Sequence, residues 1–97
     1  MAQRKNVITI EGWVNTNIYA HYNNQMGNFY LYFGKKPNGI FKSIKVMLFN
    51  DVFEFSKRIK KGDYVTIYGY LDVVEYNGNT ELVVVAQNIE LMRTNNG

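Results

Sequence analysis

The chain has 97 residues, enough for one domain with one modest core. Apolar residues make up 46% of it and charged residues 20%, as in an ordinary soluble globule, and no apolar stretch approaches the roughly 20 residues that cross a bilayer. The lack of cysteine excludes disulfides and thiolate metal sites, and a formal net charge of +3 is too small to indicate a nucleic-acid partner by itself. The eight Tyr, six Phe and one Trp are more telling, because one small core does not comfortably bury them all. We therefore expect some of these rings to face solvent or a ligand.

The first predicted strand covers residues 6–15, where apolar and polar side chains alternate. Ile8, Ile10 and Val14 share one face, and Trp13 lies on the opposite face. Trp13 is therefore a candidate for an exposed surface, either for a ligand or for an interface between subunits.

The second predicted strand covers residues 29–33 and follows a polar turn at 23–28. Two tyrosines alternate there with aromatic and aliphatic residues, so the strand has two distinct faces. The face expected to point to the core carries Phe29, Leu31 and Phe33, and the outward face carries Tyr30 and Tyr32.

A basic turn at residues 35–39 contains Asn-Gly, a strong hairpin signal, and leads to the third predicted strand at 41–49. The alternation places Val46 toward the core, and Lys45 and Phe49 outward. Phe49 ends an apolar run, so packing in the core is its alternative role.

One short helix is predicted after the third strand. Asn50 and Asp51 suit a helix N-cap, and Val52, Phe55 and Ile59 follow at helical spacing. The lysines after Ile59 supply a basic last turn that complements the helix dipole, and the next glycine ends a helix of about nine residues. The phenylalanines of this helix are expected to pack against the strands.

The fourth predicted strand covers residues 65–71, and a second Asn-Gly hairpin at 75–79 leads to a fifth strand at 81–91. Five strands with one short helix between the third and the fourth predict an all-β fold, a five-stranded OB-fold barrel. We expect a single domain over residues 1–97 with its core at about 6–92. The rival interpretation, a small SH3-like barrel, is disfavoured by the length of the helix.

Taken in order, these segments resemble the bacterial and phage single-stranded-DNA-binding protein family. The matching stretches are VITIEGWV, NFYLYF, LFNDVFEFSKRIKKGDYVTIYGYL and VVVAQNIELM, which span roughly residues 6–92. A single OB chain without a tail also resembles the primosomal replication-restart proteins that bind single strands. Two features depart from the family: residues 15–28 lack its usual Asp-Pro start, and the chain stops at Gly97 without the acidic tail that recruits replication proteins. The resemblance therefore does not imply that recruitment.

The resemblance implies that DNA lies on the outer faces of the second and third strands, with an aromatic residue at the tip of the long hairpin stacking on a base. Aromatic rings bind the flat faces of bases without reading sequence, and Lys or Arg bind phosphate. The candidate DNA-binding residues are Trp13, Tyr30, Tyr32, Lys35, Lys36, Lys42, Lys45, Phe49 and Tyr76. We expect single-stranded DNA binding with little sequence preference, in replication, recombination or the transfer of a phage or mobile element.

Catalysis has little support in the sequence. There is no cysteine, the single histidine His21 lies in a polar loop where we expect it to be solvated, and the carboxylates show no metal-ligand spacing. We expect no enzyme, no cofactor, no metal and no membrane contact, and a cytoplasmic location because the N-terminus is unlike a signal peptide. We also expect a homodimer or homotetramer. Two alternatives stay open: an OB module that binds another protein through its exposed rings, and an OB protein that binds RNA.

Overall fold

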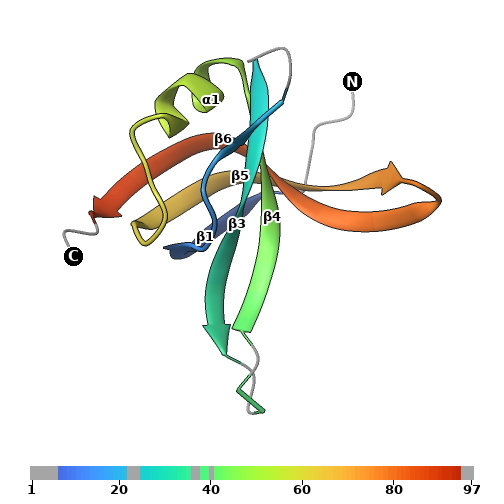
Figure 1. Cartoon of the computed structure of the whole chain (residues 1–97), viewed down its shortest axis with the longest axis horizontal. Coiled ribbons are helices and arrows are strands. Elements are labelled where there is room, and N and C mark those ends of the chain that lie inside the picture. Colours follow the sequence, from blue (N-terminus) through green and yellow to red (C-terminus); the bar gives the residue numbers. More distant parts are fainter. Residues whose placement is uncertain (1–6, 22–24, 36–37, 40, 95–97) are drawn as a thin grey trace.

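The computed structural model describes residues 7–21, 25–35, 38, 39 and 41–94, and within them one β-sheet curls into a barrel (Figure 1). Its elements are β1 (Ile8–Val14), β2 (Tyr19–Ala20), β3 (Met26–Lys35), β4 (Phe41–Phe49), α1 (Asn50–Ser56), β5 (Tyr64–Tyr76) and β6 (Asn79–Arg93). The order across the sheet is β1-β5-β6-β4-β3-β2, and β1 also pairs with β3, which closes the barrel. The pairing of β4 with β6 is parallel, and the others are antiparallel. The predicted five-stranded OB-fold barrel is confirmed, with the two-residue β2 as an addition at its edge.

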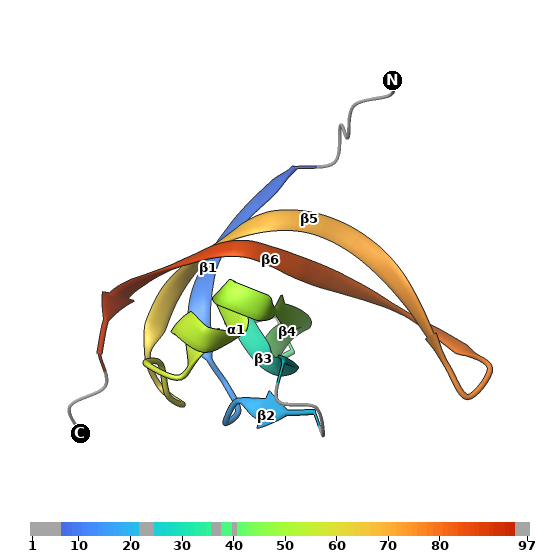
Figure 2. The ribbon, with the colours of Figure 1, turned by 90° about the horizontal axis from the view of Figure 1, so that it is seen from above.

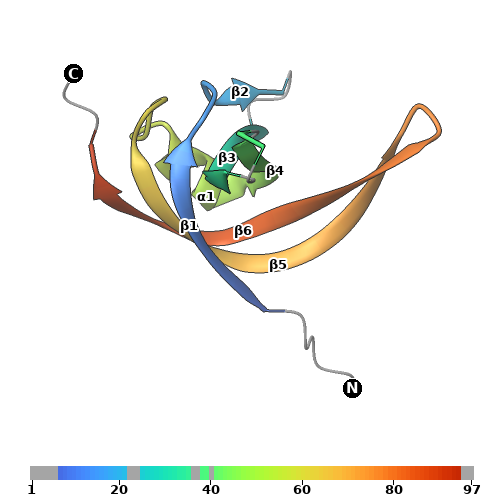
Figure 3. The ribbon, with the colours of Figure 1, turned by 90° about the horizontal axis from the view of Figure 1, so that it is seen from below.

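Barrel closure depends on β1, which runs along β5 and then turns to β3. Figure 3 shows β1 crossing from β5 and β6 toward β2. The pairing changes at Trp13, which lies opposite Tyr64 on β5 and opposite Tyr32 on β3. Gly12 permits this close crossing, because a Cβ at that position would lie 2.3 Å from the carbonyl oxygen of Tyr32.

The loop before β5 is fastened to the end of β1. The N–H of Val14 donates to the carbonyl of Asp63, and the N–H of Gly62 donates to the carbonyl of Val14, each at 2.8 Å. The side chain of Asp63 is buried, and its Oδ2 accepts from the N–H of Lys60 at 2.9 Å. These bonds fix Tyr64, the first residue of β5, close to the end of β1.

The core lies inside the barrel and follows the predicted alternation in β1, β3 and β4. Its buried side chains are Val14, Phe29, Leu31, Val46, Leu48, Phe53, Ile59, Val65, Ile67, Val84, Ala86 and Ile89. The prediction for Phe33 was wrong, since its side chain is 39% exposed. The register of β3 against β4 shifts between Tyr32 and Gly34, so the strict alternation of faces ends before Phe33 reaches the core.

The start of α1 differs from the sequence prediction. The helix covers Asn50–Ser56, which is shorter than about nine residues, and its N-cap is Phe49, which makes no side-chain cap bond. Neither Asn50 nor Asp51 is the cap, so that prediction was wrong. The N–H of Asn50 donates to the carbonyl of Gln25 at 2.9 Å, so contact with the segment before β3 continues into the first helical residue.

The packing of α1 agrees with the prediction, but its basic end does not. The helix packs against β3, β4 and β6, and Figure 2 shows it in front of the ends of β3 and β4. Phe53 is buried and Phe55 is half-buried. The last turn holds no basic residue; Lys57 is the C-cap, and its Nζ lies 3.1 Å from Glu54. No helix in the described part of the chain is long and apolar enough to span a membrane.

The β5–β6 hairpin projects beyond the barrel (Figure 1). Its strands stay paired up to Tyr76 and Asn79. Between them, Asn77 and Gly78 have positive φ values of 51° and 81°, as a type I′ turn requires, which confirms the predicted Asn-Gly hairpin. We refer to residues 72–81 as the arm.

Part of the first long loop is strand rather than turn. β2 pairs with Gly27 and Asn28 of β3, and Met26–Asn28, predicted as the end of a polar turn, belong to β3. A strand of two residues is too short to show alternation, so sequence periodicity does not reveal it. Of the rest of the predicted turn, Asn23 and Asn24 lie outside the described residues, and Gln25 belongs to no strand.

Two phenylalanines of β3 test the assignment of faces. Phe29→Ala is expected to lower the free energy of unfolding by about 3–5 kcal/mol, because the ring is fully buried and its loss leaves a cavity. Phe33→Ala removes the same ring from an exposed position of the same strand and serves as the matched control, with a clearly smaller loss. Chemical denaturation of both variants gives the two values, and equal losses would contradict the assignment.

Candidate nucleic-acid interface

The arm and the outer faces of β3 and β4 border a hollow of about 270 Å³, which we call the arm groove. Its lining residues are His21, Asn28, Lys45, Met47, Val74, Glu75, Tyr76 and Glu81. Strand alternation brings Asn28, Lys45 and Met47 to this surface, opposite the core residues of the same strands. Tyr76, at the tip of the arm, is 74% exposed. The groove therefore combines a flat aromatic ring, apolar side chains and polar groups on one surface.

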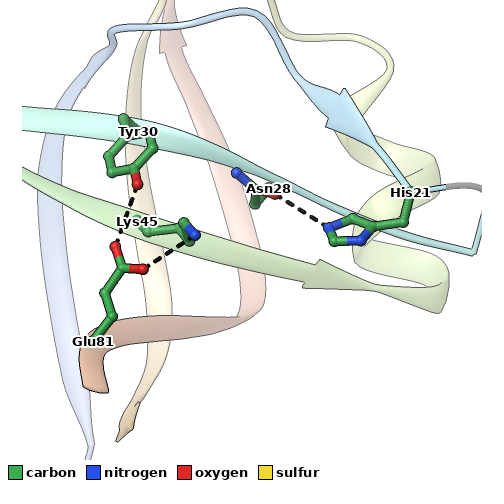
Figure 4. A network of polar contacts seen from close by, with 5 residues as sticks. All are labelled: His21, Asn28, Tyr30, Lys45 and Glu81. Carbon is green, nitrogen blue, oxygen red and sulfur yellow. Dashed lines mark hydrogen bonds and ion pairs between the residues drawn. The ribbon is translucent and has the colours of Figure 1, made fainter. Parts of the chain in front are cut away.

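Glu81 connects the arm to both strands beneath it (Figure 4). The hydroxyl of Tyr30 donates to Oε2 of Glu81 at 3.3 Å, and Nζ of Lys45 lies 3.2 Å from Oε1. Tyr30 and Lys45 are cross-strand partners on β3 and β4, and the Lys45 ammonium lies 5.8 Å from the centre of the Tyr30 ring. The Glu81 carboxylate thus binds the Lys45 ammonium and the Tyr30 hydroxyl, the two groups that could otherwise bind a phosphate.

The charge of Lys45 is stabilised where it lies. Burial lowers the pKa of Lys45, but the hydrogen bond to Glu81, the negative charge of Glu81 and the contact with the Tyr30 hydroxyl outweigh that effect, so the pKa is raised above its ordinary value. Lys45 is therefore a permanent cation at neutral pH. The pair is partly exposed to solvent, so water screens the attraction between Lys45 and Glu81.

His21 lies at the other end of the arm groove, which corrects its interpretation as a solvated loop residue. The side chain is half-buried, and its Nε2 is 3.2 Å from Oδ1 of Asn28 (Figure 4). The ring of Tyr19 meets the imidazole edge to face with centroids 5.7 Å apart. The short pairing of β2 with β3 brings His21 to this position, and sequence alternation gave no sign of it.

A second group of rings, Trp13, Tyr32 and Tyr64, lies where β1 closes the barrel, and we call it the closure cluster. Trp13 stacks on Tyr32 with ring centroids 5.3 Å apart and an interplanar angle of 25°, and it meets Tyr64 edge-on at 4.8 Å. The guanidinium of Arg93 lies 4.7 Å from the centre of the Tyr64 ring. Trp13, Tyr64 and Arg93 line a separate hollow of about 250 Å³.

The structure brings together only some of the residues predicted to bind DNA. Lys45 and Tyr76 line the arm groove, and Tyr30 is bonded to it through Glu81, whereas Trp13 and Tyr32 belong to the closure cluster. Phe49 and Lys42 are exposed on β4 outside the arm groove. The backbone of Lys35 ends β3 but its side chain is not described, and Lys36 lies outside the described residues.

The residues that the sequence did not single out include Glu81, Asn28, Tyr64 and Arg93. The Asn-Gly turn could have located Glu81, because a two-residue hairpin sets it opposite Val74. Its contact with Lys45 could not have been read in the same way, since that contact needs the parallel pairing of β4 with β6. Among the described residues there is no cluster of three His, Asp or Glu side chains that could hold a metal ion.

The fold has close neighbours among known structures. One is the mitochondrial single-stranded DNA binding protein of S. cerevisiae, with a TM-score of 0.74 and 15% identity over 93% of this chain and 97% of that one. Another is the second single-stranded DNA binding protein of Mycobacterium smegmatis, with a TM-score of 0.72 and 20% identity over 91% and 89%. The dimeric N-terminal domain of PriB from Thermoanaerobacter tencongensis has a TM-score of 0.69 and 25% identity over 92% and 98%.

These neighbours match the family resemblance that the sequence segments predicted. No curated protein sequence matches the chain. A family model described as an OB-fold nucleic acid binding domain matches residues 8–92, from the first strand through nearly all of the last. The chain therefore belongs to the family of OB-fold nucleic acid binding domains.

Proposed function

We propose that this chain binds single-stranded DNA with little sequence specificity, and that it protects such strands in replication, recombination or the transfer of a mobile element. The observation that carries the proposal is the arm groove, where Tyr76 and the Lys45 ammonium border one hollow beside Tyr30. The names of the structural neighbours, which bind single-stranded DNA, support it. We propose a binding role in the cytoplasm, without catalysis and without a cofactor.

The mechanism follows from the chemistry of unpaired bases. Each base offers a flat face to a tyrosine ring, and stacking contributes about 1–3 kcal/mol per base without reading its identity. A duplex buries these faces in its own stack, so the rings have nothing to bind. Lys45 supplies a positive charge for phosphate, and the exposed Lys42 supplies another on the β3–β4 hairpin. The proposed contact residues are those predicted from the sequence. When DNA binds, a phosphate replaces the Glu81 carboxylate as the partner of Lys45.

The proposal extends to assembly. Several large apolar side chains outside the lining of the arm groove are exposed: Tyr68, Val73, Leu82 and Met92, of which Val73 and Leu82 are cross-strand partners. Exposed apolar surface of this kind suits an interface, and the PriB neighbour is described as dimeric. We propose that this chain forms a homodimer or a larger homo-oligomer, so that several grooves share one strand.

Strand preference is the first test of the proposed function. A labelled dT oligomer of about 16 nucleotides is expected to bind well, and a duplex of equal length poorly, in fluorescence anisotropy at moderate salt. The affinity should fall with salt, with a slope of about −0.7 per phosphate contact in a log–log plot. Equal affinity for both forms would refute the proposal, and preference for an rU oligomer would indicate RNA as the ligand. Absence of oligonucleotide binding would leave the protein-interaction module as the better interpretation.

The Glu81 carboxylate gives a prediction with the opposite sign. Glu81→Gln is expected to tighten single-stranded DNA binding by about 1 kcal/mol or less, because it removes a partly screened anion that competes with phosphate for Lys45. Glu90→Gln is the matched control, since Glu90 lies on the same strand and accepts a hydrogen bond from the hydroxyl of Tyr68 instead. Anisotropy titrations of both variants decide the question. Weaker binding by Glu81→Gln would show that the carboxylate serves the bound strand rather than competing with it.

Assembly is tested by mass in solution. Light scattering at micromolar concentration is expected to give a dimer or a larger species, because removing the exposed apolar side chains from water lowers the free energy of the assembly. A constant mass of 11.3 kDa, that of one chain, across this range would refute the homo-oligomer.

A further inference from the structure

We propose that Trp13, Tyr64 and Arg93 form a second nucleobase subsite, which takes one base of a single strand that has already crossed the arm groove. The inference rests on the proposed function and extends it, because it gives the DNA strand a path across the barrel and a second binding site at the end of that path. Tyr64 and Arg93 are not among the residues that the sequence indicated for DNA binding.

The subsite is a hollow with aromatic walls. It has a volume of about 250 Å³ and is lined by Trp13, Gly62, Tyr64, Arg93 and Thr94. Pockets that enclose drug-sized ligands occupy about 300–1,000 Å³, so this hollow suits one ring system rather than a larger ligand. Trp13 is 38% exposed even though Tyr32 and Tyr64 both contact its ring. The indole therefore keeps a considerable surface available for stacking.

The walls of the hollow are held in place before any ligand arrives. The hydroxyl of Tyr64 donates to Oε1 of Glu11 at 2.7 Å, which fixes the ring beside Trp13. This hydrogen bond, together with partial desolvation and the charge of Glu11, raises the pKa of Tyr64, so the phenol remains neutral at physiological pH. Gly62, which lines the floor, is bonded to the carbonyl of Val14. A base that enters meets side chains already in place, which lowers the entropic cost of binding.

Arg93 gives the subsite its preference for nucleic acid over an apolar ligand. Its guanidinium lies 4.7 Å from the centre of the Tyr64 ring and lines the same hollow. A guanidinium can stack on a base and donate hydrogen bonds to phosphate oxygens at the same time. An aromatic wall with an adjacent guanidinium therefore fits a base together with the phosphate of its own nucleotide.

A row of aromatic side chains on β3 and β1 leads from the arm groove to the second hollow. Tyr30 is hydrogen-bonded to Glu81 of the arm groove, and Tyr32 follows it on the same face of β3. Tyr32 stacks on Trp13, which in turn contacts Tyr64. A strand that leaves the arm groove over Tyr30 reaches the subsite by following these rings.

The experiment uses Trp13 as its own probe, because it is the only tryptophan in the chain. Oligo-dT of about 4 to about 16 nucleotides, the span of footprints known for one OB barrel, is titrated into the full chain. Anisotropy reports binding and indole emission reports the subsite. We expect the shortest oligomers that bind to leave the emission unchanged, and longer ones to quench it while binding more tightly.

Two arginine variants isolate the subsite. Arg93→Ala is expected to lower the affinity for the long oligomers about 5- to 150-fold, the equivalent of one stacked base, and to leave the affinity for the short ones unchanged. Arg58→Ala is the matched control, because the Arg58 guanidinium also lies over an aromatic ring, that of Phe55 at 5.8 Å, but next to α1. Arg58→Ala should leave the quenching unchanged and lower the affinity only by the small amount expected from removing one distant positive charge. Tyr76→Ala, on the arm, should weaken long and short oligomers alike.

The outcomes separate the two proposals. If oligomers bind but Trp13 emission never responds, or if Arg93→Ala behaves like Arg58→Ala, the subsite is refuted and the single-strand function stands. If Trp13 is shielded in the free protein and indifferent to DNA, the closure cluster is an interface between copies and the subsite is refuted as well. If no oligomer binds at any length, the proposed function and the subsite both fail.

Discussion

The surface of this protein depends on how β1 closes the barrel. The strand must leave β5 and reach β3 within a few residues, and Gly12 allows the backbones to approach at the crossing. The next residue, Trp13, is thereby set between Tyr32 and Tyr64, which come from strands that are not neighbours elsewhere in the sheet. The hydrogen bonds between Val14 and the loop before β5 hold the same point from inside. One requirement of the backbone therefore determines where a cluster of rings meets solvent.

The lining of the arm groove carries one lysine and two carboxylates, so its own charges leave a small negative excess. Lys45 faces Glu81, with Glu75 nearby on the same lining, and Arg93 lies at the other hollow. Lys42 is exposed on β4 outside the lining of the arm groove, so it lies at the margin of this surface rather than at its centre. The proposed function therefore relies mainly on ring stacking at the centre of the groove, with further phosphate contacts at its edges. Such a division suits a ligand whose bases vary and whose backbone does not.

The sequence predicted the features that depend on local periodicity. Alternation along β3 correctly separated buried Phe29 from outward Tyr30. The Asn77-Gly78 pair correctly predicted the turn at the tip of the arm, because these residues favour positive φ. The sequence prediction failed at Phe33, because the register of β3 shifts there. It also failed at the cap of α1, where the N–H of Asn50 is bonded to the carbonyl of Gln25 and Phe49 is the cap.

The parts of the site that the sequence did not predict depend on how distant strands meet. Glu81 reaches Lys45 only because β6 lies parallel to β4, and Arg93 reaches Tyr64 only because the ends of β5 and β6 are paired. The position of His21 depends on β2, which is too short to have a pattern. Periodicity says which way a side chain points, but the partner that it meets is decided by the topology of the closed sheet.

Closure by β1 also governs how the chain reaches its native state. Ile8 pairs with Gly69 and Trp13 with Tyr32, so the contacts that close the barrel join segments that are far apart along the chain. Folds dominated by such pairings form in milliseconds to seconds, because loop closure precedes the gain from contact. Until β1 is in place, β3 and β5 both present open edges to other chains. Docking of β1 covers the edge of β5 at Tyr64–Gly69 and that of β3 at Leu31 and Tyr32, and so removes two edges that could pair with another chain during folding.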